Sequence, residues 1–266
     1  MSKLPTYFVS HGGGPWPWMK EQSGGAFDRL EASLQELARA LTERPKAILV
    51  VSGHWEEDVF TLSSSARPGM LYDYSGFPEH TYHIKYPAPG EPELAQRIHA
   101  MLQHAGVKSA LDPRRGYDHG TFTVMATVFP EADIPVVQLS LRHDLDPKAH
   151  IELGRVLAPL RDEGVLIIGS GLSYHNLRMF NASAAVPSRA FDAWLQTVLT
   201  TASPQEREHQ LLHWEQAPSA RIAHPQEDHL LPLMVAVGAA GMDAGSCVYH
   251  EDFFGAIAVS SFKFGQ

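Results

Sequence analysis

The sequence predicts an α/β fold: a single three-layer α/β/α domain with a mixed, largely parallel central sheet, spanning residues 1–266. Two observations predict it. Short apolar runs rich in β-branched residues alternate along the chain with longer segments of helical period. Several of these runs are apolar without interruption, which is typical of strands covered by helices on both faces. A chain of 266 residues is also long enough to bury a sizeable core.

Each expected element has its own signal. The strands are runs of Val, Ile, Leu and aromatic residues, at residues 6–10, 47–52, 135–141, 165–170, 246–250 and 256–264. The helices have apolar residues three and four positions apart, at residues 26–44, 92–106, 147–164, 188–200, 204–216 and 225–241. Because residues 188–216 contain two successive helices and no strand, they predict a helical hairpin. Residues 66–92 and 110–122 are rich in Pro, Gly, Tyr and Asp and predict loops, which at such length are often functional.

Composition narrows the classes of function. The net charge is −9 and Lys and Arg do not cluster, so neither nucleic acid nor an anionic membrane is expected as a partner. The single cysteine, Cys247, cannot form an internal disulfide. The N-terminal stretch lacks the apolar segment of a signal peptide, and residues 231–242 are too short for the roughly 20 residues that cross a bilayer. The cytoplasm is the expected location.

Three of the 15 histidines follow expected strands. His11 comes directly after residues 6–10, His54 comes shortly after the second strand, and His175 follows the fourth strand by a few residues. In open α/β sheets, ligands bind beyond the carboxyl ends of the strands. If these strands are parallel neighbours, their three imidazoles converge on one edge of the sheet.

Two further histidines have settings that suit a site. His229 is expected in the first turn of the helix at 225–241, next to Asp228, which suits a metal ligand with a carboxylate nearby. His119 lies in the second expected loop and is a candidate hydrogen-bond donor or acid/base. His209 and His213 share the four-residue spacing of the helical zinc motif. The motif's Glu is missing from this pair, however, so an amphipathic helix surface is expected there.

Three glycines, Gly12 to Gly14, follow His11 and let the backbone turn sharply and approach a ligand closely. An esterase oxyanion hole often carries the same HGGG pattern. Its G-x-S-x-G nucleophile elbow is absent, because the nearest candidate, residues 171–175, ends in His instead of Gly. A metal site is favoured instead. Imidazole ligands suit several metals, so the ligand type leaves Zn(II) and Fe(II) open.

Six motifs together resemble the DOPA-dioxygenase type of class III extradiol ring-cleavage enzyme, a group that includes protocatechuate 4,5-dioxygenase. They are, in order, PTYFVSHGGGPW, VVSGHWE, FPEHTYHIKYPAPGEPELA, GYDHGTF, IIGSGLSYHNL and DHLLPLMVAVGAAG. The resemblance runs from about residue 5 to the C-terminus. It implies one α/β domain, one mononuclear metal (Fe(II) for catalysis or Zn(II) as the bound ion), and a catechol and O2 as substrates.

The resemblance also implies roles for individual residues. His11, His54 and His229 correspond to the metal ligands, and His175 corresponds to the acid/base histidine, which is also a candidate fourth ligand. His119 matches a histidine near the substrate. Protocatechuate-type enzymes have a carboxylate as the third ligand, so a histidine at position 229 agrees with the DOPA type. Side chains or backbone in contact with substrate are expected at Gly13, Trp16, Tyr72, Tyr82 and Tyr117.

Two other classes of function stay open on the sequence. One is a metal-binding relative without catalysis, like the Memo-type proteins, although the presence of both His175 and His119 argues against it. The other is a zinc-dependent hydrolase, because three histidines and a water also form a hydrolytic site. The sequence does not specify the catechol, the ring bond that is cleaved or the oligomeric state.

Overall fold

The computed structural model describes residues 3–266, and in them an eight-stranded sheet forms the centre of the molecule. The strands are β1 (Thr6–Ser10), β2 (Ala47–Glu57), β3 (Phe60–Ser63), β4 (Ser109–Asp112), β5 (Val136–Arg142), β6 (Val165–Gly171), β7 (Gly245–Phe253) and β8 (Ile257–Phe264). Their order across the sheet is β4-β3-β5-β2-β6-β1-β8-β7. Strands β5, β2, β6 and β1 are parallel neighbours, and β8 and β7 extend the sheet in antiparallel fashion. The predicted mixed, largely parallel sheet is confirmed.

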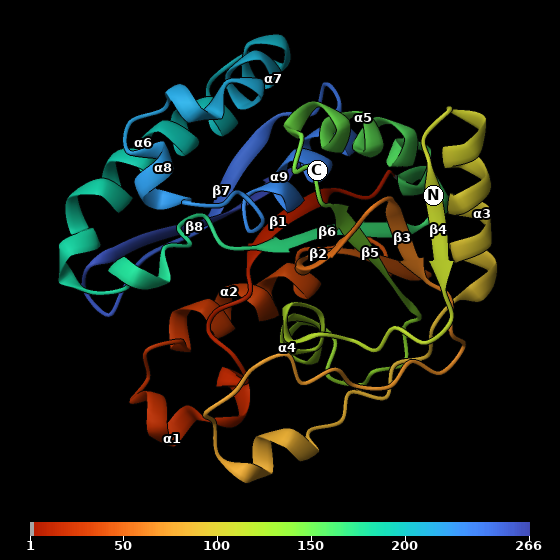
Figure 1. The fold of residues 1–266 in the computed structure, drawn as a ribbon, viewed down its shortest axis with the longest axis horizontal. Helices are drawn as coiled ribbons and strands as arrows, with labels where there is room; N and C mark the ends of the chain where they lie inside the picture. Colours follow the sequence, from red (N-terminus) through yellow and green to blue (C-terminus); the bar gives the residue numbers. More distant parts are fainter. Residues whose placement is uncertain (1–2) are drawn as a thin grey trace.

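Helices cover both faces of this sheet, as the three-layer prediction requires (Figure 1). On one face lie α5 (Pro147–Leu157) and α9 (Leu231–Ala240), and on the other α2 (Asp28–Arg39) and α4 (His119–Val128). Helix α3 (Pro92–His104) packs beside β4. The predicted hairpin is formed by α6 (Ala185–Thr200) and α7 (Pro204–Leu212), next to β7 and β8.

Short helical segments complete the described chain. They are α1 (Lys20–Ser23) and α8 (Ala220–Ala223), with 3-10 turns at η1 (Trp16–Trp18), η2 (Glu79–His83), η3 (Ala158–Glu163), η4 (Leu177–Met179), η5 (Ala182–Ala184) and η6 (Trp214–Gln216). Among the described helices, none combines the length and apolar character needed to cross a membrane. Residues 1 and 2 of the predicted 1–266 domain lie outside the described residues.

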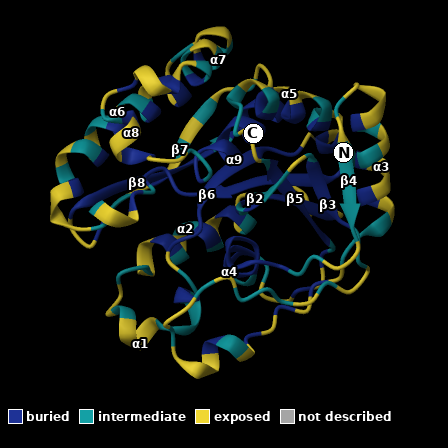
Figure 2. Ribbon diagram, in the orientation of Figure 1, coloured by how far each residue is buried: buried dark blue, intermediate teal, exposed yellow. Residues whose placement is uncertain are grey.

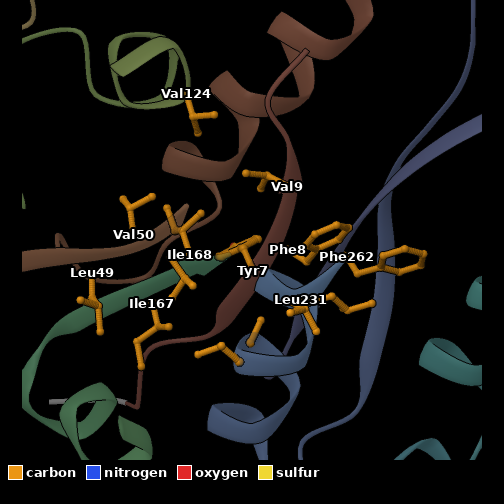
Figure 3. Packing of buried hydrophobic residues seen from close by; sticks show 14 of the residues in the cluster. Tyr7, Phe8, Val9, Leu49, Val50, Val124, Ile167, Ile168, Leu231 and Phe262 are labelled. Carbon is orange, nitrogen blue, oxygen red and sulfur yellow. The ribbon is translucent and has the colours of Figure 1, made fainter. Parts of the chain in front are cut away.

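Successive side chains along the central strands point to opposite faces of the sheet, so the sheet lies between two apolar layers (Figure 3). Val50 and Ile168 pair in register and face the helical layer that contains Val124 of α4. The next residue along β6, Ile167, faces the opposite layer, where Leu231 begins α9. Figure 2 shows that burial is concentrated in the central strands, α4 and α9, whereas the outer helices α1, α6 and α7 have exposed faces. The uninterrupted apolar runs therefore reflect strands covered on both sides.

Helix α4 and strands β3 and β4 are not predicted by the sequence pattern. Helix α4 falls partly in the expected loop 110–122, and its sequence, HGTFTVMATV, is buried at nine of ten positions. A helix buried on all sides has no amphipathic period, and its β-branched residues do not favour a helix locally. Strand β2 also continues to Glu57, with a register shift against β5 after Val51. His54 therefore lies inside a strand instead of after one.

Two buried histidines make the stability of the fold depend on pH. Burial lowers the pKa of His150 in α5 to about 4 and that of His224 after α8 to about 3, against an ordinary value of 6.5. In the unfolded chain both regain their ordinary pKa, so below pH 6.5 the unfolded state binds more protons than the folded state. Stability is therefore lost as pH falls, and we expect each histidine to cost about 2 kcal/mol of unfolding free energy between pH 7 and pH 5.

Urea unfolding at pH 7, 6 and 5, in the presence of a chelator, measures this loss. The variant His150→Gln serves as the comparison, because it retains a polar group at the site but does not titrate. Its unfolding free energy should fall less steeply with pH than that of the parent chain. Equal slopes in the two proteins would show that folding does not lower the pKa of His150.

Candidate metal centre

The edge of the sheet at the carboxyl ends of β1, β2 and β6 brings the predicted histidines together. These three strands are adjacent and parallel, so their carboxyl ends share one edge. His11 directly follows β1, His54 lies in the last part of β2, and His229 precedes α9, not within its first turn as predicted. The His11 N–H donates to the Gly171 carbonyl at 3.0 Å, and the Leu172 N–H donates to the His229 carbonyl at 3.1 Å. The end of β6 therefore holds both segments in place.

Position 171 must be free of a side chain for the His229 segment to lie this close to β6. A Cβ added at Gly171 would stand 2.2 Å from the His229 carbonyl oxygen, a backbone atom that cannot move alone. We expect Gly171→Ala to destabilise the fold by about 1–3 kcal/mol and to weaken metal binding, because the His229 segment must shift. Thermal unfolding with and without Zn(II) checks both effects.

Gly69→Ala is the matched control, since a Cβ there meets no atom within 4 Å and the backbone conformation is ordinary. The interpretation fails if the two alanine variants unfold at the same temperature and bind Zn(II) equally well.

The Nε2 atoms of His11, His54 and His229 face one another. Nε2 of His54 lies 3.1 Å from Nε2 of His11 and 3.1 Å from Nε2 of His229. Each of the three residues offers one ligand atom, and these atoms all lie within 4.8 Å of one another. His11 and His229 are buried and His54 is half-buried. The structure thus brings together the three residues predicted as ligands.

Carboxylates lie on the Nδ1 side of two of these imidazoles. His229 Nδ1 donates to Asp228 Oδ2 at 2.5 Å, and His54 Nδ1 lies 3.5 Å from Asp73 Oδ2. A carboxylate only accepts, so a proton on Nδ1 leaves the Nε2 lone pair directed at the other histidines. The Nε2 lone pairs of His54 and His229, whose nitrogens are 3.1 Å apart, would repel each other. A cation bound by both nitrogens would remove this repulsion. The spacing also fits two bonds of roughly 2.0–2.1 Å to one ion.

All three imidazoles are neutral near pH 7. Burial lowers the pKa of His11, His54 and His229 well below the ordinary 6.5, and repulsion from the neighbouring histidines lowers it further. Metal ions bind the neutral form of histidine. Three neutral nitrogen donors suit Zn(II) or Fe(II), so the residues present fit the metal that the family resemblance implies.

His175 stands beside the three-histidine group. Its ring stacks on that of His229, with 3.4 Å between ring centroids, and its Nδ1 lies 3.9 Å from Asp228 Oδ2. Burial lowers the pKa of His175, although the Asp228 carboxylate partly offsets this effect. The side chain is 19% exposed and lines a hollow of about 660 Å³, formed with Asn176, Leu177, Arg178, Met179, Pro225, Gln226 and Asp228. A neutral base at the edge of a hollow can meet a substrate.

His119 is the first residue of α4 instead of a loop residue. The carboxylate of Asp118, next to it in sequence, points elsewhere and caps α4 by accepting from the Thr121 N–H at 3.1 Å. The acid that contacts His119 is Asp73, whose Oδ1 lies 2.8 Å from His119 Nδ1. Asp73 is not among the residues that the sequence predicts. The only signal for it is its position in the tyrosine-rich expected loop 66–92.

Two of the predicted substrate contacts are buried in the structure. Tyr117 has no exposed surface, and its hydroxyl donates to backbone carbonyls, including that of Val136 at 3.1 Å. Its ring is therefore part of the apolar core in this structure, and its predicted role as a pocket wall has no exposed surface to support it. Trp16 is 2% exposed, and its Nε1 donates to the His11 carbonyl at 2.8 Å. Trp16 therefore supports the backbone of His11 and does not line an open pocket.

The other predicted contacts lie nearer to open space. Gly13 is exposed, two residues after His11. Tyr72 and Tyr82 are half-buried and belong to an aromatic cluster, in which their ring centroids are 6.2 Å apart. Tyr74 of the same cluster lies 5.8 Å from the His119 ring, also between centroids. This cluster forms an aromatic surface next to His119.

The competing histidine pair forms no site of this kind. His209 and His213 are exposed on α7 and at its C-terminus, far along the chain from the strand ends. Their contact is that of neighbouring turns, with His213 Nδ1 2.8 Å from the His209 carbonyl. The expectation of a surface helix face agrees with this placement.

Comparisons with known proteins agree with the geometry of the site. Residues 5–260 match a family described as the catalytic LigB subunit of aromatic ring-opening dioxygenase. The chain is 41% identical over 264 residues to a 4,5-DOPA dioxygenase extradiol of Beta vulgaris, covering 97% of this chain and 96% of that protein. It is 35% identical over 243 residues to the protein of that name from Escherichia coli K12, covering 90% and 86%.

A solved structure supports the same assignment. The crystal structure of an uncharacterized protein from Escherichia coli K12 matches with a TM-score of 0.77 and 30% identity, covering 98% of this chain and 100% of that one. The sequence match spans nearly the whole chain, and the fold is shared over the same length. The chain therefore belongs to the LigB family of class III extradiol, aromatic ring-opening dioxygenases.

Proposed function

We propose that this protein uses one metal ion per chain, Fe(II) for catalysis or Zn(II) as the bound ion, to open the ring of a catechol with O2. The observation that carries the metal requirement is the facing set of Nε2 atoms on His11, His54 and His229, at spacings of 3.1 Å. The substrate class rests on relatives that are named for 4,5-DOPA, which favours a DOPA-like or related catechol.

His11, His54 and His229 would hold the metal through Nε2. When bound, the metal would favour the deprotonated catechol and carry electron density from its oxygens to O2. Since a fully closed ligand shell would exclude substrate, an open side is required. Gly13, two residues after His11, is exposed, and no side chain occupies that position. We assign Gly13 and Tyr82 as substrate contacts, with Trp16 acting through the His11 backbone.

His175 and His119 would handle protons and hydrogen bonds. The neutral imidazole of His175 accepts a proton from a catechol hydroxyl and returns it to the product as the ring opens. Its 19% exposed side chain borders both His229 and the hollow, so it can reach a substrate on that side. The His119 ring lies 3.9 Å from the His54 ring, between centroids, and can accept a hydrogen bond from a second substrate oxygen.

We also propose that residues 1–266 act as one domain, because the sheet contains strands from Thr6 to Phe264. The family assignment and the shared sheet edge together argue against a role that is limited to protein contacts. All four histidines predicted near the metal lie at this edge, within the region that matches the family.

The test uses protein purified without O2 and loaded with Fe(II). It is mixed with DOPA, caffeate or protocatechuate and then exposed to air. We expect O2 uptake equal to catechol consumed, together with a yellow semialdehyde that has gained both oxygen atoms. A Zn(II)-loaded sample under argon, offered esters and amides, tests hydrolysis. The proposal is wrong if the Fe(II)-loaded protein consumes no O2 with any catechol, and hydrolysis in the zinc sample would favour a zinc hydrolase.

A further inference from the structure

Asp73 lies in the long loop of residues 64–91, between β3 and α3, and backbone pairing brings it next to His119. Met70 forms an isolated parallel bridge with Tyr117. The Leu71 N–H donates to the Tyr117 carbonyl at 2.8 Å, and the Tyr117 N–H donates to the Gly69 carbonyl at 2.9 Å. Residues two positions beyond Leu71 and Tyr117 therefore run side by side, and these are Asp73 and His119.

The 64–91 loop is also held by its own side chains. The Tyr72 hydroxyl donates to the Ile84 carbonyl and the Tyr74 hydroxyl to the Thr81 carbonyl, both at 2.6 Å. These bonds fix the backbone on both sides of Asp73. The side chain of Asp73 is 17% exposed. The carboxylate is therefore presented from a fixed backbone and not from a mobile loop tip.

One carboxylate of Asp73 serves two histidines. Oδ1 accepts from the His119 N–H at 3.0 Å and from His119 Nδ1 at 2.8 Å, and Oδ2 faces His54 Nδ1 at 3.5 Å. Because an ionised carboxylate only accepts, the hydrogen bond at 2.8 Å requires the proton of His119 on Nδ1, and the longer contact at 3.5 Å favours the same tautomer in His54. Their Nε2 atoms are then unprotonated. Nε2 of His54 faces the other two proposed ligands, and the His119 ring lies 5.3 Å from that of His11.

A second carboxylate, that of Asp228, likewise contacts two histidines. Asp228 Oδ2 accepts from His229 Nδ1 at 2.5 Å and lies 3.9 Å from His175 Nδ1. Each acid thus stands behind one proposed metal ligand and one histidine that is not in the ligand set. Asp228 is next to its ligand in sequence, whereas Asp73 reaches its histidines from a distant loop. Hence Asp73 links the 64–91 loop to the centre.

We propose that Asp73 is a positioning residue, which holds His54 as an Nε2 ligand and His119 as an Nε2 hydrogen-bond acceptor at the same centre. The identity of the group that donates to His119 rests on the proposed function. The tautomers of His54 and His119 do not depend on it. An alternative is that Asp73 itself binds an ion, since His54, Asp73 and His119 also lie close enough to form a three-residue site. That arrangement requires both Nδ1 atoms to be unprotonated, the reverse of the proposed tautomers.

The variant Asp73→Asn separates these possibilities. Asparagine keeps the shape of aspartate but has one acceptor oxygen and one donor nitrogen. In either orientation its N–H group faces Nδ1 of one of the two histidines, which must then move its proton to Nε2. Histidine 15N–1H spectra of the metal-free protein above pH 7 report the tautomer directly. We expect His54 or His119 to change tautomer, and Zn(II) affinity to fall by roughly 10- to 100-fold.

Asp112→Asn is the matched control. Asp112 likewise accepts backbone N–H bonds through Oδ1, from Arg114 at 2.7 Å and Arg115 at 3.2 Å, and the structure records no histidine contact for it. We expect wild-type tautomers and Zn(II) affinity in this variant. The proposal is overturned if Asp73→Asn folds and both quantities stay at wild-type values. It is also overturned if the wild type binds a second Zn(II) per chain that this variant loses.

The wild-type spectrum decides the matter if Asp73→Asn does not fold. His119 and His54 must both carry their protons on Nδ1, and a proton on Nε2 of His119 would contradict the role assigned to Asp73. Failure of the proposed function gives a different result. In that case the Fe(II)-loaded wild type consumes no O2 with catechols, while the tautomers and the zinc titration still report on Asp73.

Discussion

Replacing His54 with alanine is expected to abolish stoichiometric metal binding. His54 is the central member of the group, because its Nε2 lies 3.1 Å from the Nε2 atoms of both His11 and His229. Without it, two nitrogens remain, and zinc sites require three or four protein ligands. The loss in affinity should exceed the roughly 10- to 100-fold that removal of an outer hydrogen-bond partner costs. Competition titration with a chromophoric chelator measures this loss.

The unfolding temperature of His54→Ala should match that of the wild type without metal and fall below it with metal. Without metal, the facing Nε2 lone pairs add no stability to the wild-type fold. His54→Ala should therefore unfold near the wild-type temperature in the presence of chelator. Added Zn(II) should raise the unfolding temperature of the wild type but not that of His54→Ala, because a ligand stabilises the state that binds it. His209→Ala, at an exposed position on α7, is the control and should respond to Zn(II) like the wild type. Wild-type Zn(II) affinity in His54→Ala would remove His54 from the ligand set.

Replacing His175 with glutamine is expected to lower kcat by about 10²- to 10⁴-fold while one metal per chain is retained. His175 stacks on His229 at 3.4 Å between ring centroids but is not in the group formed by His11, His54 and His229. It is also the one of these four that lines the hollow described above. A base that contacts the substrate but does not bind the metal should lower kcat when it is replaced and leave the metal content unchanged. Single-turnover kinetics on Fe(II)-loaded protein, with metal analysis of the same sample, measures both.

Two other roles for His175, as a fourth metal ligand or as a packing residue, would give different losses from those expected of a base. If it were a fourth ligand, Zn(II) affinity would fall together with kcat. If it were only part of the packing around His229, the variant would lose stability and keep its turnover. His213→Gln, at an exposed position, controls for the substitution itself. Normal turnover by a folded, metal-loaded His175→Gln would remove His175 from the proton chemistry.

The central strands were predictable because their local and tertiary signals agree. The apolar runs that become β1, β5 and β6 match the observed strands closely, since helices on both faces require uninterrupted apolar sequence. Helix α4 was not predictable in this way. It is buried on nearly all sides, so it shows neither helical amphipathicity nor a strand-like boundary. Its position depends on packing between α2, β2 and β6.

Some residues of the site were likewise predictable from the sequence and others were not. His11 and His54 were predicted because ligands gather beyond the carboxyl ends of parallel strands, and β1, β6 and β2 are parallel neighbours. Asp73 was missed, because nothing in its local sequence distinguishes it from other loop acids. Tyr117 was assigned to the pocket from its loop sequence, but the structure uses it in the core, with its hydroxyl bonded to backbone carbonyls.

The sequence by itself determined the class of fold and the family, because apolar strand runs and the order of the motifs are properties of the chain alone. Only the tertiary structure decided which atoms meet. The pairing of Asp73 with His119, the ring orientations that turn Nε2 of His54 and His229 toward each other, and the place of His175 beside the group depend on contacts between segments far apart in sequence. Distances of this kind are set by the packing of the strands and loops, which local composition does not encode.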